Sequence, residues 1–179
     1  TTWSRRLWLM VFMGSSGRFP DFTPQPLKCG FRPNRPDTMP RIKIELPESF
    51  HFSTEIPIYI GHINYGHHLD NAQFISLISE ARVRFLKSMG YSEMDVEGVG
   101  IIVADVAAQY RSEAFHGETL VAEMGANDFN KYGCDFVWRL SDKASGREVA
   151  RGKHGIMFFD YSARQATSVP AAFIAKVGG

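Results

Sequence analysis

One long stretch of the chain carries apolar residues at helical spacing. Between residues 71 and 89 the apolar side chains recur every three or four positions and form a single stripe, which consists of Phe74, Leu77, Ile78, Ala81 and Phe85. Asp70 or Asn71 would cap the first turn, and Gly90 would end the helix. The pattern predicts one long helix with a broad apolar face.

Alternating apolar and polar residues on both sides of this helix are typical of strands. Before it, residues 41–50 place Ile42, Ile44 and Leu46 on one face, and residues 54–64 form a second run in which Pro57 favours a sheet edge. After it, strand-like segments separated by turn residues span 100–115, 119–129, 134–140 and 147–162, and Pro170 opens a short helix. The order predicts an α+β domain, an antiparallel sheet wrapped around one long helix.

The composition is that of a single soluble domain. The chain has 179 residues, of which 44% are hydrophobic, and a net charge of +1, which argues against a nucleic-acid binder. Residues 1–38 are basic and rich in proline, without apolar periodicity, so we expect an irregular extension followed by a domain over residues 39–179. One sheet around one helix leaves an edge or face uncovered, which predicts a homodimer or homotetramer.

The cysteines and the apolar runs bear on location. Two cysteines, Cys29 and Cys134, form neither a disulfide framework nor a metal motif, so we expect a reducing, cytoplasmic setting. No apolar run approaches the roughly 20 residues that span a bilayer. The basic and apolar start of the chain is similar to a weak secretory or organellar signal, but it lacks a clear cleavage site. An upstream extension or a flexible arm is favoured there.

The order of elements and one polar motif together carry a family resemblance. The segment "IGHINYGHHLDNAQF" precedes the helix segment "LISEARVRFLKSMGY", and "VAAQYRSEAFHGETL" and "REVARGKHGIMFFD" follow. Over residues 42–170 this arrangement resembles the hotdog-fold thioesterases related to 4-hydroxybenzoyl-CoA thioesterase. The resemblance implies hydrolysis of an acyl-CoA or acyl-carrier thioester without a cofactor.

The same resemblance implies where the chemistry lies. In that family a carboxylate, often in an Asp-x-Asp pattern, ends the first long strand, and the helix start directs a backbone N–H at the thioester carbonyl. Here His62 and Asn64 occupy the two acidic positions, and Asn71 starts the helix. Asn64 can hold a water molecule and His62 can take its proton. The other interpretation is that both side chains bond to the local turn backbone.

Other residues of this region are candidates for supporting roles. We expect His68 and Tyr65 to contact the substrate. Tyr110 and the pair Phe158 and Phe159 can line an acyl pocket, although core packing explains them equally well. Glu80 is the first carboxylate to consider in place of the missing acids, although an i,i+4 pair with Arg84 is favoured. The motif's three histidines do not have the spacing of a metal site, and we predict no metal.

Two other functions stay open at this point. A hotdog module that binds an acyl thioester or mediates assembly without turnover would explain the loss of both acids. The segment "GHINYGH" is also similar to a hotdog hydratase motif, but His62 and Tyr65 replace its Asp and Pro.

Overall fold

The computed structural model describes residues 42–177. In chain order its elements are β1 (Phe52–Pro57), the 3-10 helix η1 (Ile60–His62), α1 (Asn71–Ser88), β2 (Gly100–Tyr110), β3 (Thr119–Asn127), β4 (Gly133–Asp142), β5 (Glu148–Asp160), β6 (Gln165–Ala166) and α2 (Ala171–Val177). The predicted extension over residues 1–38 lies outside the described residues, and the domain boundary at residue 39 stays a prediction.

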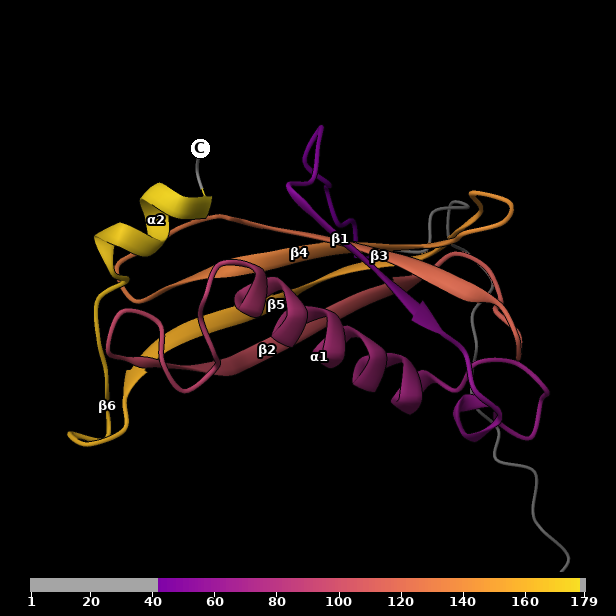
Figure 1. The fold of residues 1–179 in the computed structure, drawn as a ribbon, viewed down its shortest axis with the longest axis horizontal. Coiled ribbons are helices and arrows are strands. Elements are labelled where there is room, and N and C mark those ends of the chain that lie inside the picture. Colours follow the sequence, from indigo (N-terminus) through magenta and orange to yellow (C-terminus); the bar gives the residue numbers. More distant parts are fainter. Residues whose placement is uncertain (1–41, 178–179) are drawn as a thin grey trace, which may run out of the picture. The chain divides into compact units, whose positions relative to one another are not determined.

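The strands form one antiparallel sheet in the order β1-β3-β4-β5-β2, and the short β6 pairs with β5. Helix α1 lies across one face of this sheet (Figure 1). This confirms the predicted α+β class, with four main strands after the helix. The two-residue β6 was not predicted.

The alternation of β4 explains why α1 binds this face. Phe136, Trp138 and Leu140 alternate along the strand and are fully buried. The Trp138 ring centroid lies 5.7 Å from that of Phe74, and Phe136 packs edge-on against Phe85 at 5.3 Å. Both partners belong to the apolar stripe of α1. The stripe therefore packs on the inner face of the sheet through aromatic contacts.

The ends of α1 agree with the sequence prediction. The Asp70 carboxylate accepts hydrogen bonds from the amides of Ala72 at 2.8 Å and Gln73 at 3.3 Å, which caps the first turn. Gly90 follows the helix with a φ of +83°, a left-handed conformation that glycine adopts without strain. The helix start, where the candidate chemistry lies, is thus fixed by its own cap.

The strand predicted over residues 41–50 is wrong in the described part, residues 42–50. Ile44 is buried, but the segment pairs with no strand. Instead, the carbonyl oxygens of Ile42 and Ile44 accept hydrogen bonds from the side chains of Gln109 and Arg151. The alternation reflects packing onto the sheet rather than membership in it.

The second predicted strand, residues 54–64, is only half correct. Strand β1 ends at Pro57, which lies on an edge strand as predicted, and the chain then turns into η1. His62 lies in η1, where its amide donates to the Tyr59 carbonyl at 2.9 Å, and Asn64 lies in the loop that follows. The prediction that the strand continues through His62 and Asn64 is therefore wrong. The segment predicted over residues 100–115 likewise ends earlier, at Tyr110.

None of the helices within residues 42–177 is long and apolar enough to cross a membrane.

Candidate active site

A tight loop connects η1 to α1. The Asn64 amide donates to the His68 carbonyl at 2.9 Å, and the His67 amide donates back to the Asn64 carbonyl at 3.0 Å. The Asn64 side chain closes the turn, because its Oδ1 accepts from the Gly66 amide at 2.8 Å. The Asp70 amide then bonds to the His62 carbonyl at 2.9 Å. These bonds place Asn64 beside the start of α1.

The amide of Asn71 is the helix-start donor that the cap leaves unused. Asp70 satisfies the amides of Ala72 and Gln73 through its side chain and that of Phe74 through its carbonyl at 2.8 Å. No described residue accepts a hydrogen bond from the Asn71 amide. This N–H lies at the positive end of the helix dipole and is available to an oxygen atom of a ligand.

A pocket of about 380 Å³ opens at this helix start. Its walls come from the loop before α1, the first turn of α1, the end of β2 and the start of β5. They are Asn64, His68, Leu69, Asn71, Phe74, Tyr110, Arg111, Ser112, Glu113, Ala114 and Val149. Several apolar side chains beside polar groups suit a ligand with an apolar part and a polar reacting group.

Three residues that line the pocket, Tyr110, Arg111 and Glu113, carry side chains that set its charge and its hydrogen-bond donors. Burial, followed by the negative charge of Asp70, raises the pKa of Tyr110, so its hydroxyl stays protonated as a hydrogen-bond donor. Arg111 is half exposed and lies 3.8 Å from the Glu148 carboxylate. Glu113 is the one carboxylate among the lining residues of this pocket.

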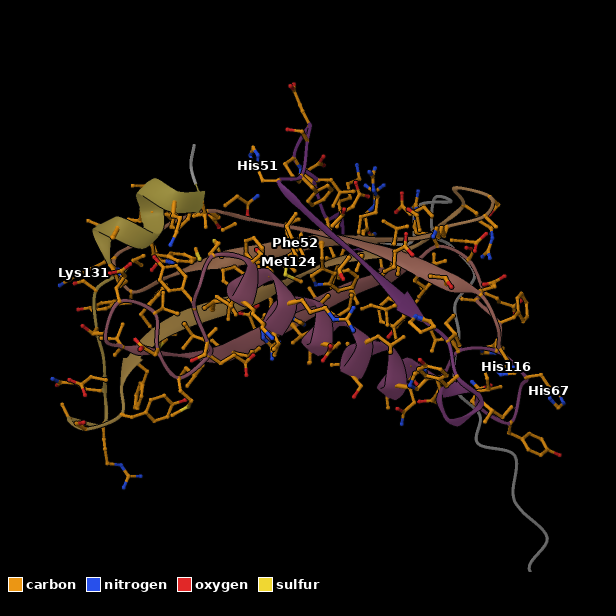
Figure 2. All side chains as sticks on the ribbon, in the orientation of Figure 1. His51, Phe52, His67, His116, Met124 and Lys131 are labelled. Atoms are coloured by element: carbon orange, nitrogen blue, oxygen red, sulfur yellow. The ribbon has the colours of Figure 1, made fainter. Side chains whose placement is uncertain are left out.

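The structure brings three of the predicted site residues together. Asn64, His68 and Asn71 all line the pocket. The Nδ1 atom of His68 lies 3.4 Å from Asn64 Nδ2 and 3.3 Å from the Leu69 carbonyl oxygen. The neighbouring His67 is exposed, with a φ of +64°, and its side chain projects outward from the loop before α1 (Figure 2). His68 therefore turns to the pocket while His67 turns to solvent.

The other predicted site residues lie outside this pocket in the described chain. His62 Nδ1 accepts from the Tyr59 amide at 3.1 Å, and Tyr65 is fully exposed at 102%. The Glu80 carboxylate accepts from Arg84 Nε at 2.7 Å, so the favoured i,i+4 pair is present. Roles for His62, Tyr65 and Glu80 in the chemistry stay predictions.

Glu113 was missed by the sequence analysis. The segment that contains it alternates like a strand and was assigned to one that continued to residue 115, where a glutamate is an ordinary surface residue. Because β2 ends at Tyr110, Glu113 lies in the segment after the strand, where it is exposed and is one of the residues that line the pocket. Within residues 42–177, no group of three or more His, Cys, Asp and Glu side chains could hold a metal ion.

The fold and this helix-start pocket together define a hotdog protein of the thioesterase type. Residues 58–177 match the family model of the thioesterase-like superfamily, and the chain belongs to that superfamily. No curated protein sequence matches the chain.

Solved structures share the fold at low sequence identity. The 1,4-dihydroxy-2-naphthoyl-CoA thioesterase Slr0204 from Synechocystis is 15% identical with a TM-score of 0.64, over 71% of this chain and 95% of that one. The gentisyl-coenzyme A thioesterase BH1999 is 11% identical with a TM-score of 0.61, over 68% and 98%. The protein SAV2348 from Staphylococcus aureus, solved in complex with CoA, is 16% identical with a TM-score of 0.65, over 76% and 86%.

Proposed function

We propose that the protein hydrolyses an acyl-CoA or acyl-carrier thioester in the pocket at the start of α1. The observation that carries this proposal is Asn71, which lines the pocket and whose amide has no acceptor among the described residues. A thioester oxygen bound there gains negative charge during attack by water. A preorganised N–H at a helix start stabilises that charge.

Asn64 and the apolar wall complete the arrangement. With its Oδ1 fixed by the Gly66 amide, Asn64 is held at the pocket and positions the attacking water. Leu69, Phe74 and Val149 are buried and offer an apolar surface to the acyl group. His68 contacts the substrate or supports Asn64 from the same wall.

We also propose a homodimer or homotetramer that works in the cytoplasm. The edge strand β2 exposes Val103 at 40% and Val106 at 44%, an apolar edge that a second copy would cover. A partner subunit would complete the pocket and could bring Tyr65, His62 or Glu80 to it. The exposed positions of Tyr65 and Glu80 support such a role more than one within a single subunit.

The test of the polarising amide is a proline substitution. Asn71 is the first helical residue, where proline fits, and the ψ of 140° at Asp70 is a conformation that a residue before proline adopts. Asn71→Pro removes only the N–H of interest, whereas Asn71→Ala keeps it. We expect Asn71→Pro to lower kcat by about 100- to 1000-fold and Asn71→Ala to keep most of it.

The assay is thiol release from acetyl-CoA, octanoyl-CoA and benzoyl-CoA, with thermal melting to show that each variant folds. Asn64→Ala should lose turnover while Glu80→Ala keeps it, and the reverse would place the chemistry at the helix carboxylate. Equal turnover in Asn71→Pro and Asn71→Ala would refute the role of the amide. Thermal stabilisation by a thioester without any thiol release would instead favour the non-catalytic binding module, which the loss of both motif acids supports.

A further inference from the structure

Thioester hydrolysis needs a group that takes a proton from the attacking water. Asn64 is neutral and cannot do so, and the Nδ1 atom of His62 already accepts the Tyr59 amide outside the pocket. His68 Nδ1 is held between Asn64 Nδ2 and the Leu69 carbonyl. The residues of the motif therefore leave the position of the base open.

We infer that Glu113, which follows β2, is the general base of this reaction. The inference rests on the proposed function and adds its proton acceptor. Glu113 is exposed and is the one acidic residue among those that line the pocket, which also include Asn64 and Asn71. It comes from a loop far from the motif in sequence, so the chemistry has moved to a different element from the one that carries the acids in the family's pattern.

The main chain holds Glu113 beside the helix start. The Leu69 amide donates to the Ala114 carbonyl at 2.8 Å, which joins the segment after β2 to the loop before α1. Leu69 immediately precedes the cap residue Asp70, and Ala114 is buried. The residue next to Glu113 is thus tied to the residue two positions before the Asn71 amide.

Arg147 fixes the same segment without neutralising Glu113. Its Nη1 donates to the Glu113 carbonyl and to Ser112 Oγ, the latter at 2.8 Å. Its Nη2 donates to both carboxylate oxygens of Glu118, at 3.0 and 3.2 Å. The positive charge of Arg147 is therefore paired with Glu118, and no described residue forms an ion pair or hydrogen bond with the Glu113 carboxylate. An unpaired carboxylate at a pocket wall is able to accept a proton from water.

Glu113 takes up one proton and gives it back in each turnover. Water loses a proton to the Glu113 carboxylate while its oxygen bonds to the thioester carbon, and the carbonyl electron pair moves to the oxygen at the Asn71 amide. Collapse of this intermediate breaks the carbon–sulfur bond, and the thiolate takes the proton from Glu113. The products are the free acid and the thiol, and Glu113 returns to its ionised form.

The experiment compares Glu113→Gln, Glu113→Asp, His68→Gln and Glu48→Gln with the wild type. The substrate is the best hydrolysed of acetyl-CoA, octanoyl-CoA and benzoyl-CoA. Glu48→Gln is the matched control, because it makes the same change at an exposed carboxylate outside the pocket lining. We expect Glu113→Gln to lower kcat by about 100- to 10,000-fold, Glu113→Asp to keep measurable turnover, and Glu48→Gln to stay within about threefold of wild type.

Two further readouts separate a base from a structural residue. The wild-type profile of kcat against pH should fall on the acid side, where a carboxylate takes up its proton, and this limb should be missing from the residual activity of Glu113→Gln. The dissociation constant of CoA and the melting temperature should be the same in both proteins.

Each contrary outcome has a distinct meaning. Thiol release by Glu113→Gln within about threefold of wild type overturns the role of Glu113 and leaves the proposed function intact. Loss of activity together with loss of CoA binding or folding overturns it also, in favour of a structural role. Loss of the acid limb in His68→Gln, with the limb kept in Glu113→Gln, assigns the base to His68. Absence of thiol release by the wild type overturns the proposed function and this inference together.

Discussion

His154 is a buried histidine whose protonation should destabilise the folded protein, and this can be measured. It lies on β5 with no exposed surface. Arg82 Nη1 lies 3.2 Å from its Nδ1, and because an arginine can only donate, His154 Nδ1 must accept. The imidazole is therefore neutral, with its proton on Nε2, which has no hydrogen-bond partner among the described residues.

The surroundings of His154 determine the size of the effect. Burial, and then the positive charge of Arg82, lower its pKa from 6.5 to about 4, although the Asp105 carboxylate opposes the shift. Because the folded-state pKa is depressed, the unfolded chain binds the proton more readily below pH 6.5. The free energy of unfolding is therefore unaffected by the protonation of His154 above pH 6.5, and it decreases as the pH falls toward 4. Between pH 7 and pH 4.5 the loss amounts to roughly 2 kcal/mol.

The variant His154→Gln isolates this contribution. Its side-chain oxygen can accept from Arg82 in place of Nδ1, but it does not titrate. Urea unfolding at pH 7 and pH 4.5, at one protein concentration, gives the free energy of unfolding of both proteins. We expect His154→Gln to be less stable than wild type at pH 7, because its fit is poorer, yet to lose roughly 2 kcal/mol less on acidification.

Acidification also protonates carboxylates with lowered pKa, such as Glu148 beside Arg151, so only the difference between proteins is informative. The exposed His51 (Figure 2) supplies the control, and His51→Gln should keep the wild-type loss. Equal losses in wild type and His154→Gln would refute the assignment of a neutral buried imidazole.

Three other predictions follow from single contacts. Asp70→Ala removes the acceptor of two helix amides and should lower the free energy of unfolding by about 1 kcal/mol, whereas Asp70→Ser should restore most of it, as urea titration would show. Gly152→Ala would place a Cβ 2.1 Å from the Trp138 ring and should destabilise by about 1 to 3 kcal/mol, whereas Gly61→Ala, with nothing within 4 Å, should be close to neutral in the same titration. Burial, and then a nearby carboxylate, raise the pKa of the Cys134 thiol to about 12, so in a variant without the other cysteine a thiol reagent should label it only after unfolding.

The sequence predicted the elements whose signals are local. The helix over residues 71–88 followed from its apolar stripe and from Asp70 and Gly90, all within one segment. The four later strands followed from alternation and turn residues. Ile44 shows the limit of this approach, because packing against a sheet face produces the same alternation as pairing within the sheet. The pattern cannot distinguish the two.

The site was predictable only as far as the motif extends. Asn64 was predicted from its position in the motif that carries the family resemblance, and Asn71 was predicted as the first residue of a capped helix. Arg82 belongs to the segment that carries the family resemblance, yet its partners, Glu93 at 2.7 Å and His154 at 3.2 Å, become visible only in the fold. His154 lies 72 residues away from Arg82, and no local pattern indicates such a contact. Glu113 was missed for a different reason, because its segment alternates like a strand and the end of β2 at Tyr110 was not predicted.

Asn64 explains how a motif can lose its acids and keep its shape. The turn depends on a side-chain oxygen that accepts from the Gly66 amide at 2.8 Å, and aspartate and asparagine both supply one. In the proposed mechanism the polarising donor is the backbone N–H of Asn71, which no change of side chain other than proline removes. The shape of the loop and the activation of the carbonyl are thus independent of the residue that accepts the proton. The proposed base, Glu113, lies on the segment after β2, which the hydrogen bond between Ala114 and Leu69 joins to the loop before α1. It therefore lines the same pocket without any change in the fold.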